Sequence, residues 1–217
     1  MEKAVRLVVR APVLNAMNND INIKREILTD LSRFSFCKSR LSLKDLKVLA
    51  YQMTGHAFSK SLVSSVARRC AWGNPQVLTC YPVLRGTPFP TTFWLTCPYL
   101  ARKCGTLETE GAITELEKLL SEDESGYRRY NSLYALVRLS LLNPAEKDFM
   151  RLYKPKMYSV IRGAGIGGIR KCGKPTVKCI HLQTAAMLAL GTHPAGKWLR
   201  KRLGELSCPD CRCTRDC

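Results

Sequence analysis

The residues of this chain best suited to chemistry are its cysteines, and the densest group of them lies at the C-terminal end. The last ten residues, CPDCRCTRDC, hold Cys208, Cys211, Cys213 and Cys217. A C-x2-C step lets two thiolates reach one ion, which is the common geometry of zinc and iron–sulfur ligation. We expect this tail either to bind a metal or to be a set of free thiols, and the spacing leaves both open.

Three further cysteines are far apart in sequence, but each lies at the edge of a predicted element. Cys70 follows a predicted helix, Cys97 precedes Pro98, and Cys179 falls in the first turn of a predicted helix. A helix N-terminus stabilises a thiolate through its free N–H groups and its dipole, so we expect Cys97 and Cys179 to ionise readily. The alternative is a buried cysteine that packs as a small apolar residue.

The composition is that of a folded, strongly basic protein. The 217 residues are 46% hydrophobic, which is too apolar for a disordered chain, and they carry a formal net charge of +18. We find no apolar window long enough for a membrane span and no continuous apolar core of a signal peptide. We therefore expect a cytoplasmic protein with reduced thiols. A pI near 9.7 indicates a polyanionic partner.

Hydrophobic spacing and caps predict a helix-rich α+β fold with a few short strands. Predicted helices cover about residues 20–34, 43–54, 59–69, 98–108, 113–120, 127–142, 176–190 and 198–206. Predicted strands cover residues 76–80 and 91–95, and residues 143–157 read as a linker. We expect a small helical N-terminal extension over 1–44, a single core domain over 45–203, and a cysteine-rich tail over 204–217.

Six short segments carry a family resemblance. They are VARRCAWGNPQVLTCYP (66–82), GTPFPTTFWLTCPYL (86–100), LETEG (107–111), GIGG (165–168), VKCIH (177–181) and HPAG (193–196). In this order they closely resemble the bacterial family called domain of unknown function 501, over about residues 45–199. The resemblance implies that Cys70, Cys97 and Cys179 are the family's three characteristic cysteines, and it implies no reaction. Departures from the family pattern occur at Thr106, near Ala185 and at His193.

Three thiolates from three segments fit two kinds of metal site. They can hold a [4Fe–4S] cluster with one iron left open, or, with a histidine, a closed tetrahedral zinc site. Cys179 and His181 are two residues apart, about 200° around a helix, so we expect that they do not easily face one ion. His56 and His193 are then candidates for a fourth ligand. We favour an iron–sulfur cluster or an open metal site.

Two residues in the matched motifs are candidate catalytic groups. Glu108 is a candidate general base, and His181 is a candidate acid or base. The alternatives are a solvated helix residue for the glutamate and a packed core residue for the histidine.

The remaining candidate sites are for anions. The G-x-G-x-x-G spacing at Gly163, Gly165 and Gly168 lacks the flanking helix and parallel strands of a dinucleotide site, so we expect a tight loop beside basic residues. Basic clusters recur along the chain, and RNA is favoured over DNA because no DNA-reading motif appears. The candidate nucleic-acid contacts are Arg69, Arg170, Lys171, Lys178, Lys197, Arg200 and Lys201.

Taken together, the sequence predicts a metal-dependent cytoplasmic enzyme that acts on RNA or another anionic substrate. In it Cys70, Cys97 and Cys179 hold the cofactor, and Glu108 and His181 lie near it. One alternative is a non-enzymatic RNA- or ribosome-associated protein with a structural zinc site. Another is an adaptor that docks on a protein partner, which the amphipathic helices alone support.

Overall fold

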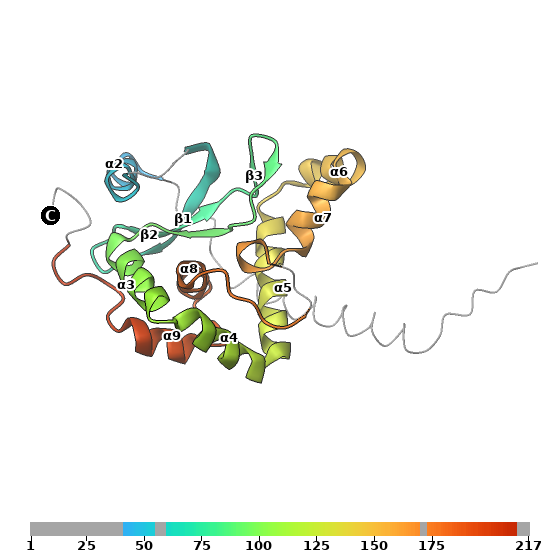
Figure 1. The fold of residues 1–217 in the computed structure, drawn as a ribbon. Coiled ribbons are helices and arrows are strands. Elements are labelled where there is room, and N and C mark those ends of the chain that lie inside the picture. Colours follow the sequence, from blue (N-terminus) through green and yellow to red (C-terminus); the bar gives the residue numbers. More distant parts are fainter. Residues whose placement is uncertain (1–40, 55–59, 170–172, 212–217) are drawn as a thin grey trace, which may run out of the picture. The chain divides into compact units, whose positions relative to one another are not determined.

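The computed structural model describes residues 41–54, 60–169 and 173–211, which belong to one unit, Phe36–Cys217. Their fold is α+β and rich in helix, as predicted: a small antiparallel sheet is combined with helices that make up most of the unit (Figure 1). The helix expected around residues 20–34 lies outside the described residues. Within the described ranges, no helix is both long and apolar enough to cross a membrane.

The helices and strands alternate little along the chain, because the strands come early and the helices follow. Two short 3-10 helices, Lys60–Leu62 and Ile166–Gly168, add to the main elements. In chain order the main elements are α2 (Leu43–Gln52), β1 (Val63–Arg69), β2 (Pro75–Cys80), β3 (Val83–Leu84), β4 (Thr87–Pro88), β5 (Phe93–Leu95), α3 (Pro98–Thr109), α4 (Ala112–Glu122), α5 (Glu124–Ser140), α6 (Pro144–Tyr153), α7 (Pro155–Gly163), α8 (Ile180–Leu190) and α9 (Gly196–Leu203).

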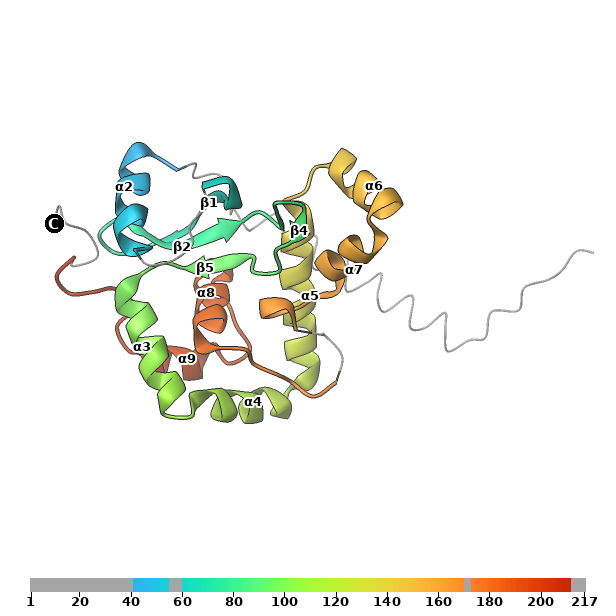
Figure 2. The ribbon, with the colours of Figure 1, turned by 45° about the horizontal axis from the view of Figure 1, so that its top comes forward.

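The main sheet has the strand order β1-β2-β5, and both pairs are antiparallel. Every residue of the central strand β2 is buried, because helices cover both faces of the sheet. Figures 1 and 2 show α2 on one face and α8 on the other. The sheet is therefore the layer that separates α2 from the rest of the helices.

Helix α8 is the centre of the helical part, and α3 packs along it. It is mostly apolar and buried around most of its circumference: Ile180, Ala185 and Met187 are inaccessible to solvent, and so are the polar Gln183 and Thr184. The helix begins at Ile180 with Cys179 as its N-cap, so the predicted cap at Thr176 is wrong. Its N-cap, Cys179, keeps an extended backbone (φ −165°, ψ 158°), and α8 thus begins directly after this cysteine.

Two other sequence expectations are wrong. Residues 63–69 of the predicted helix 59–69 form strand β1, because pairing with β2 and the packing of Val66 on Leu78 outweigh the local helical pattern. The predicted linker 143–157 contains helix α6 and the start of α7. Asn143 and Glu146 form a capping box at the start of α6, which is a local signal that the sequence does carry.

The glycine-rich segment after α7 forms a tight turn, as predicted, and Gly167 and Gly168 adopt positive φ angles of 69° and 85°. The turn is held by the fully buried guanidinium of Arg138, which donates to the backbone oxygens of Ala164 (2.9 Å) and Gly165 (3.0 Å). A Cβ atom at Gly165 would lie 2.3 Å from Asn131 Oδ1. Gly165 is therefore needed for close packing, and Gly167 and Gly168 for the positive φ angles of the turn.

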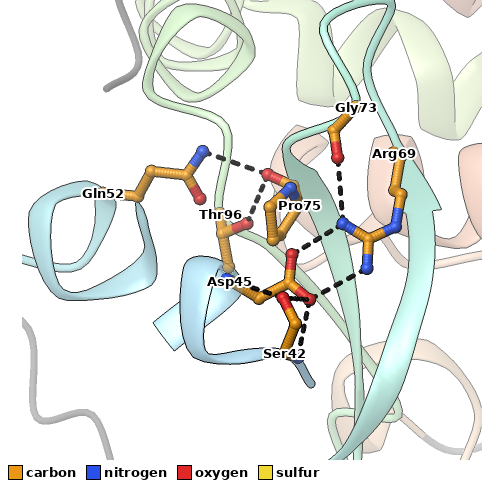
Figure 3. A network of polar contacts seen from close by, with 7 residues as sticks. All are labelled: Ser42, Asp45, Gln52, Arg69, Gly73, Pro75 and Thr96. Carbon is orange, nitrogen blue, oxygen red and sulfur yellow. Dashed lines mark hydrogen bonds and ion pairs between the residues drawn. The ribbon is translucent and has the colours of Figure 1, made fainter. Parts of the chain in front are cut away.

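An ion pair joins α2 to the sheet (Figure 3). Asp45, which caps α2 together with Ser42, accepts hydrogen bonds at 2.6 and 2.9 Å from Arg69 at the end of β1. The Asp45 side chain is only 4% exposed, and its bond with Arg69 is the main cause that lowers its pKa to about 2. The same guanidinium donates to the Gly73 carbonyl, so it also holds the turn between β1 and β2.

We predict that Asp45→Asn lowers the free energy of unfolding at pH 7 by about 2 kcal/mol, as the depressed pKa implies. The pKa is lower in the folded chain than in the unfolded chain. This stabilisation is therefore present above pH 4 and is lost as the pH falls toward 2. Urea unfolding at pH 7 and pH 2.5 measures both effects. Asp148→Asn, which alters an exposed pair with Arg151, is the control and should change little. Equal stability of Asp45→Asn and the parent chain at pH 7 would contradict the assignment.

Candidate active site

The chemically suited residues that the structure brings closest together are Glu108, Cys179 and His181. Of the His, Cys, Asp and Glu residues in the described ranges, they form the one group of three whose ligand atoms all lie within 4.8 Å of one another. Cys179 and His181 stand at the start of α8, and Glu108 comes from the last turn of α3. All three side chains are half-buried.

This grouping overturns the helical-wheel argument about Cys179 and His181. The expected 200° separation requires both residues to be inside the helix, but Cys179 is the N-cap and its backbone is extended. Its side chain therefore does not follow the helical spacing, and it reaches the same site as the ring of His181.

The Glu108 carboxylate fixes the start of α8. Its Oε1 atom accepts a hydrogen bond from the Ile180 amide at 2.6 Å and a longer one from the His181 amide at 3.4 Å. These amides belong to the first turn, where a helix has no internal acceptors. The same Oε1 lies 2.9 Å from His181 Nδ1. One oxygen of α3 thus caps α8 and orients the imidazole ring.

The His181 ring is held at both nitrogens by groups that only accept hydrogen bonds. Nδ1 faces the Glu108 carboxylate, and Nε2 lies 3.0 Å from the backbone carbonyl of Ala101. These acceptors favour a proton on both nitrogens, which is the imidazolium form of the ring. The pKa of His181 is accordingly raised to about 9, chiefly by its hydrogen bond with Cys179 and further by Glu108, although burial opposes the rise.

A cavity of about 630 Å³ opens beside this group, and both Cys179 and His181 line it. Its other walls come from α2, β5, α3 and the segments flanking β5. They are mostly apolar, with a few polar groups among them. The apolar lining residues include Met53, Phe89, Trp94, Leu95 and Leu182, and the polar ones include Gln52 and Thr96.

The other two family cysteines are not members of this group. Cys97 is the N-cap of α3, before Pro98 as predicted, but it is 2% exposed. Burial raises the pKa of Cys97, so the expectation that it ionises readily is wrong: desolvation outweighs the nearby amides of α3. Cys70 lies just after β1 and is half-exposed. A cofactor shared by Cys70, Cys97 and Cys179 stays a prediction.

The tail cysteines are described in part. Cys208 is a buried free thiol, and Cys211 is buried and disulfide-bonded. Cys213 and Cys217 lie outside the described residues.

Of the other two histidines, the structure describes His193, which adds no ligand to the site. His193 is buried, donates from Nε2 to Gln183 Oε1 (2.8 Å), and accepts the Ala195 amide at Nδ1 (3.0 Å). Burial lowers its pKa to about 3, so the ring is neutral. His56 lies outside the described residues.

The residues predicted to contact nucleic acid differ in whether their side chains are exposed, paired or outside the described ranges. Arg69 is engaged with Asp45, whereas Arg170 and Lys171 lie outside the described residues. The remaining four side chains are exposed, and three of them lie on α9: Lys178, Lys197, Arg200 and Lys201.

Comparison with known proteins gives the family of the chain. The protein-family model described as "Protein of unknown function (DUF501)" matches residues 66–201. The chain therefore belongs to the DUF501 family, as its motifs indicate, and the matched range includes Glu108, Cys179 and His181. No curated protein and no solved structure matches the chain.

We predict that the free energy of unfolding falls as the pH rises from 6.5 to 9, because His181 has a higher pKa in the folded chain than in the unfolded one. The stabilisation is complete below pH 6.5 and is lost as the pH passes through 9. Urea unfolding across this range should show the decline in the parent chain and a smaller one in His181→Gln. His193→Gln is the control, because His193 is neutral in the folded chain throughout this range. Identical slopes in the parent chain and His181→Gln would refute the imidazolium.

Proposed function

We propose that this DUF501 protein is a cysteine-dependent enzyme in which Cys179 is the nucleophile and His181 is its acid–base partner. The observation that carries the proposal is that the His181 ring and the Cys179 sulfur lie within 4.8 Å of each other, at a helix N-terminus and on the wall of a cavity. The thiolate is the reactive form of cysteine, and an adjacent cation and a helix N-terminus both stabilise it.

The chemistry that suits this pair is acyl transfer. The Cys179 thiolate attacks the carbonyl carbon of a substrate and forms a thioester, while the bond to the leaving group breaks. For this step the His181 ring releases its contact with the Ala101 carbonyl. The freed Nε2–H gives a proton to the leaving group, and the neutral ring then takes a proton from the water that hydrolyses the thioester. Glu108 keeps the ring in place through its contact with Nδ1. The thiolate and the imidazolium are thereby restored.

The surroundings of the pair favour a substrate with an apolar part and a negative charge. The cavity walls are mostly apolar, and the exposed Lys178 directly precedes the nucleophile. An acyl group carried on a polyanion, such as an acylated RNA, has both features. We propose RNA ahead of DNA as that polyanion, and a cytoplasmic location, where the thiol stays reduced.

We predict that iodoacetamide alkylates Cys179 faster than the other thiols, and that His181→Gln slows this alkylation at pH 7 by about tenfold or more, because the cation beside the sulfur is lost. Mass spectrometry of the peptide containing Cys179 measures the rate. Cys179→Ser removes the signal, and His193→Gln is the matched control that should leave the rate unchanged. An unchanged rate in His181→Gln would overturn the proposal.

A second candidate is a metal-dependent enzyme that uses the same group. Its support is the set of three ligand atoms within 4.8 Å, with the Ala101 carbonyl on Nε2 as the outer contact usual for metal-bound histidine. Three ligands would leave one position open to the cavity. We rank it second because Oε1 of Glu108 is already engaged by backbone N–H groups and by the His181 ring.

Metal analysis after anaerobic purification separates these candidates. Zinc that is lost in His181→Gln and Cys179→Ser would favour the metal-dependent enzyme. Iron and a visible absorption band that are lost in each of Cys70→Ser, Cys97→Ser and Cys179→Ser would favour the three-cysteine cluster expected from the sequence. A thiol enzyme predicts a metal content that does not depend on Cys179.

The basic face of α9 supports RNA binding. We predict that replacing Lys197, Arg200 and Lys201 with Gln weakens the binding of single-stranded RNA and lowers the slope of log K against log salt by about 2. Fluorescence anisotropy between 50 and 200 mM salt measures both changes. Replacing the exposed Arg128, Lys154 and Lys156 is the matched control, and an equal loss in both variants would mean that α9 has no special role.

A further inference from the structure

The chain that follows α9 docks on the turn between β1 and β2 through polar contacts. The Gln76 side chain donates to the Leu206 carbonyl (2.6 Å), and the Trp72 indole donates to the Cys208 carbonyl (2.7 Å). The Ala71 amide donates to the hydroxyl of Ser207 at 3.1 Å. These contacts connect residues more than 120 positions apart. They carry the first cysteines of the tail to one defined place on the core.

Two family cysteines border the same place. Cys70 opens the turn, since its amide donates to the Asn74 carbonyl at 3.0 Å and its own carbonyl accepts from Gly73. Cys97 lies beside the start of β2, just after the turn, because its amide donates to the Gln76 carbonyl at 3.4 Å. Gln76 thus contacts the backbone of Cys97 with its carbonyl and the tail with its side chain.

The tail thiols face this turn and are shielded from solvent. Cys208 and Cys211 are 3% and 4% exposed, and the Asn74 side chain donates to Cys211 Sγ at 3.6 Å. Cys97 is shielded in the same way, at 2% exposed, whereas Cys70 is partly exposed. Positive charge is also near, because Arg69 precedes Cys70 and the Lys103 amine binds the Leu203 and Glu205 carbonyls.

We propose that Cys70, Cys97, Cys208 and Cys211 form a zinc site that fastens the tail to the core. The set consists of one C-x2-C pair and two single cysteines, which is a donor set of structural zinc sites. Four thiolates at about 2.3 Å from zinc lie about 3.8 Å from one another. An N–H group that donates to a ligand sulfur, as Asn74 does, is the outer contact such sites use.

The site must close and be reduced before it can bind zinc. The sulfurs of Cys70, Cys97 and Cys208 do not all lie within 4.8 Å of one another, and Cys211 is disulfide-bonded. The proposed set differs from both sequence expectations, because it takes two cysteines of the family and two of the tail and leaves out Cys179. It shares no residue with the proposed thiol enzyme, which uses Cys179, His181 and Glu108.

Zinc analysis of the full chain, purified under reducing conditions, tests the site. We expect about one zinc per chain, and a loss of most of it in Cys208→Ser and in Cys70→Ser. Cys179→Ser and Cys80→Ala are the matched controls, since Cys80 is a buried thiol on β2 outside the set, and both should keep the metal. Zinc that is absent from the parent chain, or that is lost with Cys179 but not with Cys208, would overturn the proposal.

A measurement on the unmutated chain guards against variants that fail to fold. Removing zinc with a chelator should release the tail and change the fluorescence of Trp72, whose indole binds the Cys208 carbonyl. In Trp72→Phe the change should be absent, and added zinc should restore the original signal in the parent chain. A spectrum that does not respond to chelator or to zinc would also refute the site.

Discussion

The Glu108 carboxylate at the start of α8 is the contact on which the rest of the site depends. The N-cap of this central helix, Cys179, makes no side-chain hydrogen bond that would satisfy the first amides. The carboxylate of α3 supplies the acceptor for them and lies beside the His181 ring. The position of α3 therefore sets where α8 begins, which keeps Cys179 outside the helix and within reach of the ring.

Buried charge in this basic protein is compensated in two different ways. Asp45 meets Arg69 directly, and the pair joins α2 to the sheet. Arg138 is instead surrounded by backbone oxygens near the end of α7, where the carbonyls of a helix are unpaired and the dipole is negative. Its side chain also stacks on Tyr134 and receives support from Thr92. The guanidinium thus organises the glycine turn and the lead into β5 without a carboxylate.

Local sequence signals predicted much of the fold correctly. The wrong predictions fall where contacts between distant parts of the chain decide the structure. Ser42 with Asp45, and Pro98 after Cys97, mark helix starts that the structure has. The start of α6 also has a local signal, the capping box of Asn143 and Glu146. Strand β1 could not be predicted from its own residues, because its pairing with β2 determines that this segment is a strand. The sequence indicated Cys179, His181 and Glu108 as candidates. Their grouping depends on the Ala101 carbonyl, which no local pattern marks, and on an N-cap at Cys179, three residues after the predicted cap at Thr176.

Helix α3 carries contacts of both cysteine groups along one axis. Cys97 is its N-cap, Lys103 binds the tail carbonyls, the Ala101 carbonyl accepts from His181, and Glu108 caps α8. A helix of 12 residues is about 18 Å long and does not shorten easily. Any sliding or rotation of this rod moves the anchor of the tail and the seat of the imidazole together. A displacement of one end of α3 is therefore expected to displace the contacts made at its other end.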